Sequence, residues 1–205
     1  MTTVAEACAL IEQACAELPL DRTGPHSYVV TLPGTHKLKT NVNLIVGEHA
    51  LRVEAFVVRQ PDENREAVWA WLLRRNAKLY GVAFTIDAVG DVYLTGRLPL
   101  DAVTPQELDR LLGAALAAAD ESFDTLLELG FSTAIKREWR WRISRGEPTD
   151  NLRAFRHLMD SPDAAGAEAP APAPSGDGPA VPGGTAVLDT GTDVLPEPGR
   201  DPRAG

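Results

Sequence analysis

Cysteine is scarce in this sequence, which contains only Cys8 and Cys15. Apolar residues recur every three to four positions from Val4 to Leu18, which predicts an amphipathic helix over 3–18. The two cysteines would lie about 10 Å apart along that helix, too far for a disulfide between them. We therefore expect two small, buried core residues and no disulfide framework.

Long apolar runs are absent as well. No stretch approaches the roughly 18 consecutive apolar residues of a membrane span. The N-terminal segment MTTVAEACAL has neither the cationic start nor the apolar run of a secretory signal. These two absences lead us to expect a cytoplasmic protein.

The sequence also lacks the motifs that carry common chemistries. It has no G-x-x-x-x-G-K-[ST] loop and no G-x-G-x-x-G fingerprint. GFSTA (130–134) follows a helical pattern and lacks the closing glycine of a nucleophile elbow. The histidines are scattered without the spacing of zinc ligands, at His26, His36, His49 and His157. We expect no enzymatic activity, no cofactor and no metal.

Positive charge is in deficit, with a net charge of −9, so we do not expect a nucleic-acid partner. One stretch departs from this, KREWRWRISR (136–145), whose mixture of basic and aromatic residues is also typical of single-strand binding. Its alternation would suit a strand too. We favour a helix that ends at Gly146, because one stripe places Trp139 in the core and only Trp141 fails to fit it. That stripe is Phe131, Ile135, Trp139 and Ile143.

Five segments alternate apolar and polar residues, as strands with one buried face do: 27–33, 40–46, 51–58, 82–87 and 91–98. A tight turn at Glu48-His49 would pair Val46 with Leu51, Leu44 with Val53 and Val42 with Ala55. A three-residue loop ending at Gly90, in the left-handed conformation, would pair Ile86 with Val92 and Phe84 with Leu94. Both connections are short, which predicts a mainly antiparallel sheet.

Further helices are predicted over 63–80, 104–130, 133–145 and 151–158. The clearest start is TPQE, where Thr104 is the cap, Pro105 lies in the first turn and Glu107 completes a capping box. The whole order is α-β-β-β-α-β-β-α plus C-terminal helices. It predicts a two-layer α+β fold, a five-stranded mainly antiparallel sheet with helices on one face.

Two stretches resemble the YbjN domain family, bacterial proteins also called sensory transduction regulators, in its high-G+C Gram-positive branch. They are LPGTHKLKTNVNLIVGEHALRVEAFVVRQPDENREAVWAWLLRRNAKLYGVAFTIDAVGDVYLTGRLPL and LLELGFSTAIKREWRWRISRGEPTDNLRAF. The resemblance covers residues 1–158. It implies the fold of type III secretion chaperones, a homodimer, and a regulatory or chaperone-like module that binds an unidentified protein without catalysis.

Two candidate surfaces follow from the patterns. The helix at 63–80 has apolar residues on more than one face, which indicates a second surface to cover. We take Trp69, Leu73 and Tyr80, together with Trp141, as candidate partner-binding residues; ordinary core packing is the alternative for each. A small-ligand or enzymatic site on the polar sheet face is the alternative function. Its candidate residues are Arg52, Tyr93 and Arg97, which could grip an anion.

Residues 159–205 differ in composition from the rest. They are rich in proline, alanine and glycine and contain no aromatic residue, and 161–205 carry seven acidic and two basic side chains. Such a segment cannot bury enough apolar surface to offset its ordering entropy. We expect a disordered acidic tail that contributes nothing to the fold of 1–158.

Overall fold

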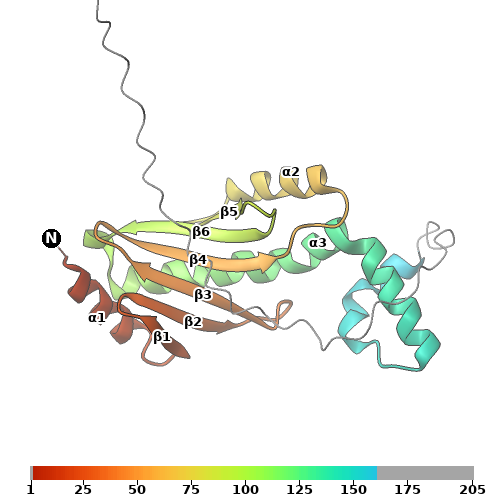
Figure 1. The fold of residues 1–205 in the computed structure, drawn as a ribbon, viewed down its shortest axis with the longest axis horizontal. Coiled ribbons are helices and arrows are strands. Elements are labelled where there is room, and N and C mark those ends of the chain that lie inside the picture. Colours follow the sequence, from red (N-terminus) through yellow and green to blue (C-terminus); the bar gives the residue numbers. More distant parts are fainter. Residues whose placement is uncertain (1, 161–205) are drawn as a thin grey trace, which may run out of the picture. The chain divides into compact units, whose positions relative to one another are not determined.

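A computed structural model describes residues 2–160 of the chain. It is an α+β domain (Figure 1) with a short helix between β6 and α3, η1 at Leu100–Ala102. The elements are α1 (Val4–Ala14), β1 (Leu20–Gly24), β2 (Ser27–Pro33), β3 (Lys39–Val46), β4 (Ala50–Val58), α2 (Arg65–Asn76), β5 (Ala83–Ile86), β6 (Val92–Pro99), α3 (Pro105–Arg145) and η2 (Asp150–Asp160). The predicted tail, 159–205, lies outside the described residues except for Met159 and Asp160, which belong to η2.

The sheet has six strands in the order β1-β2-β3-β4-β6-β5, and every neighbouring pair is antiparallel. The predicted registers are confirmed: Val42, Leu44 and Val46 face Ala55, Val53 and Leu51, and β5 pairs with β6 as expected. Gly90 has a φ of 92°, the left-handed conformation predicted for its loop.

The prediction of five strands missed β1. This strand pairs Leu20 with Val30 and Asp21 with Val29 at the edge of the sheet. Its sequence, LDRTG, has three exposed residues and no apolar alternation. An edge strand that buries so little leaves no periodic signal, and its glycine and aspartate resemble a loop.

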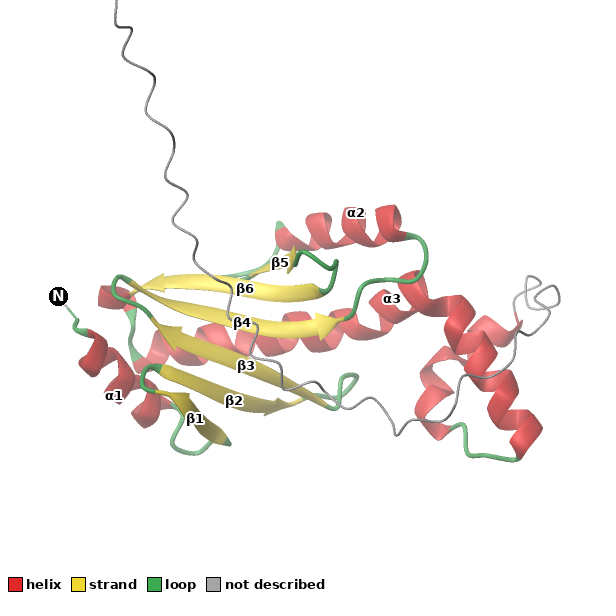
Figure 2. Ribbon diagram, viewed as in Figure 1, coloured by secondary structure: helices red, strands yellow, loops and turns green. Residues whose placement is uncertain are grey.

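Two helices form the second layer. Figure 2 shows α1 and α3 against one face of the sheet, while α2 lies beside β5 at its edge. The inward strand residues pack on the buried side of α3, including Leu108, Leu111 and Ala115. Cys8 and Cys15 are buried and free, as predicted. Within residues 2–160, no helix lies on the opposite face of the sheet.

The predicted break between the helices 104–130 and 133–145 is present as a kink inside α3, where Phe131 has non-helical dihedrals (φ −144°, ψ 15°). α2 is shorter than the predicted 63–80. Asn64 has a left-handed φ of 51°, so the helix starts after it, and beyond Asn76 the N–H groups of Lys78 and Leu79 bond to carbonyls three residues back, as in a turn. Thr104 caps α3 as predicted, accepting from the N–H of Glu107 (3.2 Å), and Gly146 ends it. The predicted capping box is not completed, because the carboxylate of Glu107 accepts from Tyr80 and Arg110 instead.

The kink of α3 is packed against the segment that precedes α2. A Cβ atom at Gly130 would lie 2.9 Å from Cβ of Pro61, closer than van der Waals contact permits. The carbonyl of Gly130 accepts from the backbone N–H groups of Asp62 (3.0 Å) and Glu63 (3.2 Å). Only a glycine at position 130 lets the two backbones approach this closely.

The first prediction uses two glycines of the same helix. We expect Gly130→Ala to lower the free energy of unfolding by about 1–3 kcal/mol, because the added methyl group overpacks the contact with Pro61. Gly113 has nothing within 4 Å of its Cβ position, so Gly113→Ala should raise the free energy of unfolding by roughly 1 kcal/mol. Urea titration followed by circular dichroism measures both. Equal effects of the two substitutions would show that the kink tolerates a side chain.

Candidate interaction surfaces

Apolar side chains are exposed on α2 and on the neighbouring strand β5. Leu73 on α2 is 70% exposed and Ile86 at the end of β5 is 53% exposed. Trp69 lies one turn before Leu73 on the same side of the helix and is half-buried against the core. We call Trp69, Leu73 and Ile86 the α2–β5 surface. Isolated exposed leucines are common, but apolar residues grouped on adjoining elements indicate a contact surface.

The free edge of β5 is closed to strand addition by Asn76. The side-chain amide of Asn76 donates to the carbonyl of Phe84 (3.1 Å) and accepts from its backbone N–H (2.7 Å). These bonds occupy the positions that a further strand would use. A partner at this edge must therefore contact side chains rather than extend the sheet.

The other two predicted partner-binding residues, Tyr80 and Trp141, are not part of the α2–β5 surface. Tyr80 is 48% exposed, but its hydroxyl donates to Glu107 and the guanidinium of Arg110 lies over its ring (5.5 Å). Trp141 lies on the part of α3 beyond the kink, half-buried. The four residues are thus divided among separate regions.

The basic stretch 136–145 is helical, as predicted, but its apolar stripe is only partly core. Phe131 and Ile135 are buried, whereas Ile143 is 62% exposed. Trp139, predicted to be core, is half-buried and lines a groove of about 480 Å³ between α3 and η2. The stripe loses its cover because the distal half of α3 packs against η2 rather than against the sheet.

The residues predicted for a ligand face do share the uncovered face of the sheet. Arg52 on β4 is the register partner of Arg97 on β6. Tyr93 faces Phe56 across the same strands, and their rings meet edge to face with centroids 5.5 Å apart. Burial raises the pKa of Tyr93, and the negative charge of nearby Asp87 raises it further. The face thus carries an arginine pair and an aromatic pair.

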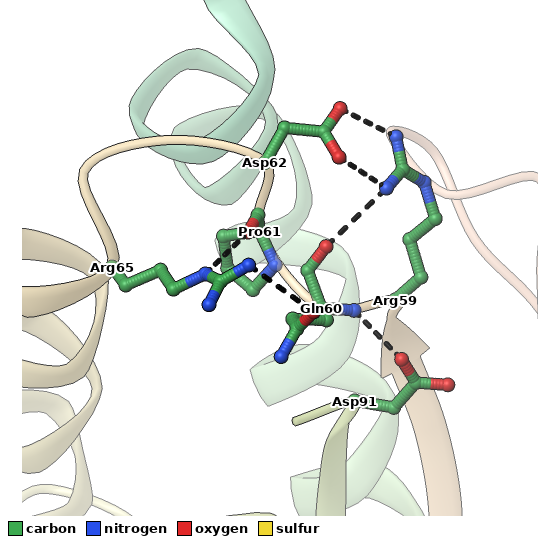
Figure 3. Close-up of polar contacts among 6 residues, drawn as sticks. All are labelled: Arg59, Gln60, Pro61, Asp62, Arg65 and Asp91. Atoms are coloured by element: carbon green, nitrogen blue, oxygen red, sulfur yellow. Dashed lines mark hydrogen bonds and ion pairs between the residues drawn. The ribbon is translucent and has the colours of Figure 1, made fainter. Parts of the chain in front are cut away.

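A polar loop that the sequence analysis did not single out connects β4 to α2. Arg59 donates to both carboxylate oxygens of Asp62 (2.6 and 2.7 Å), and its guanidinium lies 4.5 Å from the ring centroid of Phe131 at the kink. The hydrogen bond from Arg59 is the main reason that the pKa of Asp62 is lowered. Figure 3 shows the cluster: Arg59, Gln60, Pro61, Asp62, Arg65 and Asp91.

The same loop caps the distal half of α3. Glu63 accepts from the backbone N–H of Thr133 (2.7 Å), from its hydroxyl (2.8 Å) and from the hydroxyl of Ser132 (3.1 Å). The N–H of Thr133 is one of the backbone donors that a break in a helix leaves without a helical partner. In the sequence, PDEN indicated only the start of a helix. The bonds from Glu63 to residues 132 and 133 join positions about seventy residues apart, and no local pattern predicts them.

A second loop, between β2 and β3, is held by α3. Asp120 accepts from the backbone N–H groups of Thr35 (2.9 Å), His36 (2.9 Å) and Lys37 (2.8 Å). Burial acts to raise the pKa of Asp120, but these three bonds outweigh it and lower the pKa. Asp124 contacts the ring of His36 (2.6 Å) and raises its pKa.

Lys37 extends from this loop to the end of β4. Its ammonium group donates to the carbonyls of Phe56 and Val57, the latter at 3.0 Å, where the register with β6 shifts. The ring centroids of Phe56 and Phe123 lie 5.4 and 6.0 Å from Nζ. Burial lowers the pKa of Lys37 to about 8. Lys37 thus gives both carbonyls a hydrogen bond at the end of β4, where the ladder with β6 is irregular.

The second prediction follows from this lysine. Between pH 8 and its ordinary pKa of 10.5, Lys37 is neutral in the folded chain and protonated in the unfolded chain. Unfolding then takes up a proton, so raising the pH stabilises the fold by up to about 1.4 kcal/mol per pH unit. Lys37→Met removes this contribution.

Denaturant titrations at several pH values from about 8 to 10 test this, as the difference between wild type and Lys37→Met. The difference cancels the opposing effects of buried tyrosine and cysteine. Lys39→Met, at an exposed lysine of the neighbouring strand, is the control and should parallel the wild type. A Lys37→Met curve that also runs parallel to the wild type would mean that Lys37 stays charged in the fold.

Within residues 2–160, no group of three or more histidine, cysteine, aspartate or glutamate side chains is placed to hold a metal ion. In the same part of the chain, no helix combines the length and the apolar character needed to cross a bilayer.

Comparison with solved structures finds likenesses of fold. One is the ExoU–SpcU complex of the type III secretion system of Pseudomonas aeruginosa (TM-score 0.42, 16% identity, covering 60% of this chain and 97% of that one). Another is the Yersinia pestis type III secretion chaperone SycH with a fragment of YscM2 (TM-score 0.39, 16% identity, 55% and 96% covered). Likenesses at this level say nothing of what the present chain binds.

Sequence relatives are much closer. A protein of Mycobacterium tuberculosis described as uncharacterized is 59% identical over 134 residues, covering 65% of this chain and 73% of the relative. One of Mycobacterium leprae is 50% identical over 165 residues, covering 77% and 90%. Residues 7–128 match the family YbjN, described as "Putative bacterial sensory transduction regulator". As its sequence stretches had indicated, the chain belongs to the YbjN family.

Proposed function

We propose that this chain is a regulatory or chaperone-like protein-binding module that acts without catalysis and self-associates as a homodimer through the α2–β5 surface. The description of its family as a sensory transduction regulator supports a regulatory role. The observation that carries the proposal is Leu73, a large apolar side chain left 70% exposed in the middle of a helix.

The surroundings of Leu73 suit a contact between two helices. Trp69 offers a large, partly buried ring one turn away, and aromatic residues of this kind contribute much of the energy of protein interfaces. Arg74 and Lys78 nearby are exposed, as the polar rim of an interface is. With the edge of β5 occupied by Asn76, the side chains of α2 are what this edge of the domain offers a partner.

A contact of one copy with another through the same surface also fits the geometry of a single helix. In a two-fold dimer, both copies contribute the same surface: if one residue of α2 contacts a second residue on the other copy, that second residue contacts the first in return. One apolar patch can therefore form both sides of the interface. Leu73 would then lie near the centre, where removal of apolar area costs most.

The third prediction is that Leu73→Asp converts the protein to a monomer. A charge at the centre of an apolar contact is desolvated without a partner, which weakens association by several kcal/mol. Light scattering coupled to size-exclusion chromatography over a range of concentrations measures the mass directly.

Leu38→Asp is the matched control. Leu38 is 86% exposed in the loop between β2 and β3, away from α2, so the same chemical change there should leave the mass unchanged. A wild-type protein that is monomeric at every concentration, or a dimer that persists in Leu73→Asp, would refute self-association through this surface.

A further inference from the structure

Two arginines face each other on the uncovered face of the sheet. Arg52 and Arg97 are register partners on β4 and β6, so their Cβ atoms start only about 5 Å apart. Like charges placed directly opposite each other on neighbouring strands are destabilising. Neither guanidinium makes an ion pair with a carboxylate within residues 2–160.

The Nε atom of Arg52 is also left without a hydrogen bond within residues 2–160. It is buried and has no hydrogen-bond partner in the described part of the chain. A buried N–H of a charged group without an acceptor is destabilising, because it has lost its hydrogen bond to water and gained none in return. Among the described residues the pair therefore has no counter-charge, and the Nε–H group of Arg52 has no acceptor.

The nearest acidic residue on this face does not supply them. Glu54 is two residues beyond Arg52 on β4, opposite Thr95, and the same face carries Arg52 and Glu54 because side chains alternate. No ion pair joins Glu54 to either arginine. Residues 2–160 therefore offer the pair no counter-charge.

The aromatic pair lies further along the same two strands. Phe56 and Tyr93 are four residues from Arg52 and Arg97 respectively, which is about 13 Å of strand. Phe56 is exposed in part and its ring contacts Tyr93 edge to face. A peptide lying extended along the strands advances by the same distance over four of its own residues.

We propose that the uncovered sheet face binds an extended, acidic segment of a partner protein, with one carboxylate between Arg52 and Arg97 and an apolar or aromatic residue four positions away on Phe56 and Tyr93. A carboxylate between two guanidiniums accepts charge-assisted hydrogen bonds from both, which removes their repulsion. The inference rests on the protein-binding function proposed above, but it uses a surface separate from α2.

The test is a titration of the full chain followed by nitrogen-15 NMR, in which arginine Nε–H groups give their own signals. The probe is a short peptide of serine, threonine and glycine with one glutamate and, four residues further on, one phenylalanine; its reversed sequence is titrated alongside. We expect saturable shifts of the Arg52 and Arg97 Nε–H signals with at least one of the two. Replacing the glutamate of the peptide by glutamine should abolish them.

Variants assign the effect to the pair. Arg97 is exposed, so Arg97→Gln should fold normally and weaken peptide binding about tenfold, as expected for loss of a charge-assisted bond. Arg145→Gln, at an exposed arginine at the end of α3, should leave the affinity unchanged. No saturable shift with either peptide, or equal affinity for the glutamine peptide, would overturn the proposal.

Glu54→Gln tests the internal alternative. If an external carboxylate is the counter-charge, removing the charge of Glu54 should leave peptide binding equal or tighter. If Glu54→Gln by itself moves the Arg52 and Arg97 signals as far as the peptide does in the wild type, Glu54 is the counter-charge and the proposal fails. Repeating the titration with Leu73→Asp separates this result from the proposed dimer, because a monomer should bind the peptide equally well.

Discussion

The contact between the polar loop 59–65 and the kink of α3 is the constraint on which the rest of the domain depends. The carbonyl of Gly130 accepts two backbone N–H groups from the loop, and Glu63 caps the helix segment that follows. These bonds stabilise the change of direction within α3. The part before Phe131 packs on the sheet, and the part after it packs against η2.

Acidic side chains play a consistent structural role in this arrangement. Asp120 collects three consecutive N–H groups of one loop, and Glu63 collects a backbone N–H and two hydroxyls at the kink. In both places a carboxylate satisfies backbone donors that no regular element pairs. Part of the strongly negative charge of the chain therefore serves the fold, and composition alone is a poor guide to its partners.

The two faces of the sheet lead to different consequences. The inward face is apolar and covered by α1 and α3, so its residues define the core. The outward face carries the arginine pair and the aromatic pair, and no helix of residues 2–160 lies over them. At the edge, α2 seals β5 through Asn76 and leaves Leu73 exposed. The surfaces we propose for binding are thus the ones that the two-layer packing does not use.

The sequence by itself determined the class of fold, the pairing of both hairpins and the family, because alternation, turn residues and helix caps act over a few residues and leave local patterns. It placed Arg52, Tyr93 and Arg97 on one face for the same reason. Only the tertiary structure decided what depends on distant contacts. It shows that β1 pairs at the edge of the sheet and that Arg52 lies opposite Arg97. It also shows that Leu73 is exposed, that Trp69 is half-buried, and that Trp139 lines a groove instead of packing in the core. In each case the outcome depends on which element of the fold lies alongside, and the spacing of residues along the chain does not contain that information.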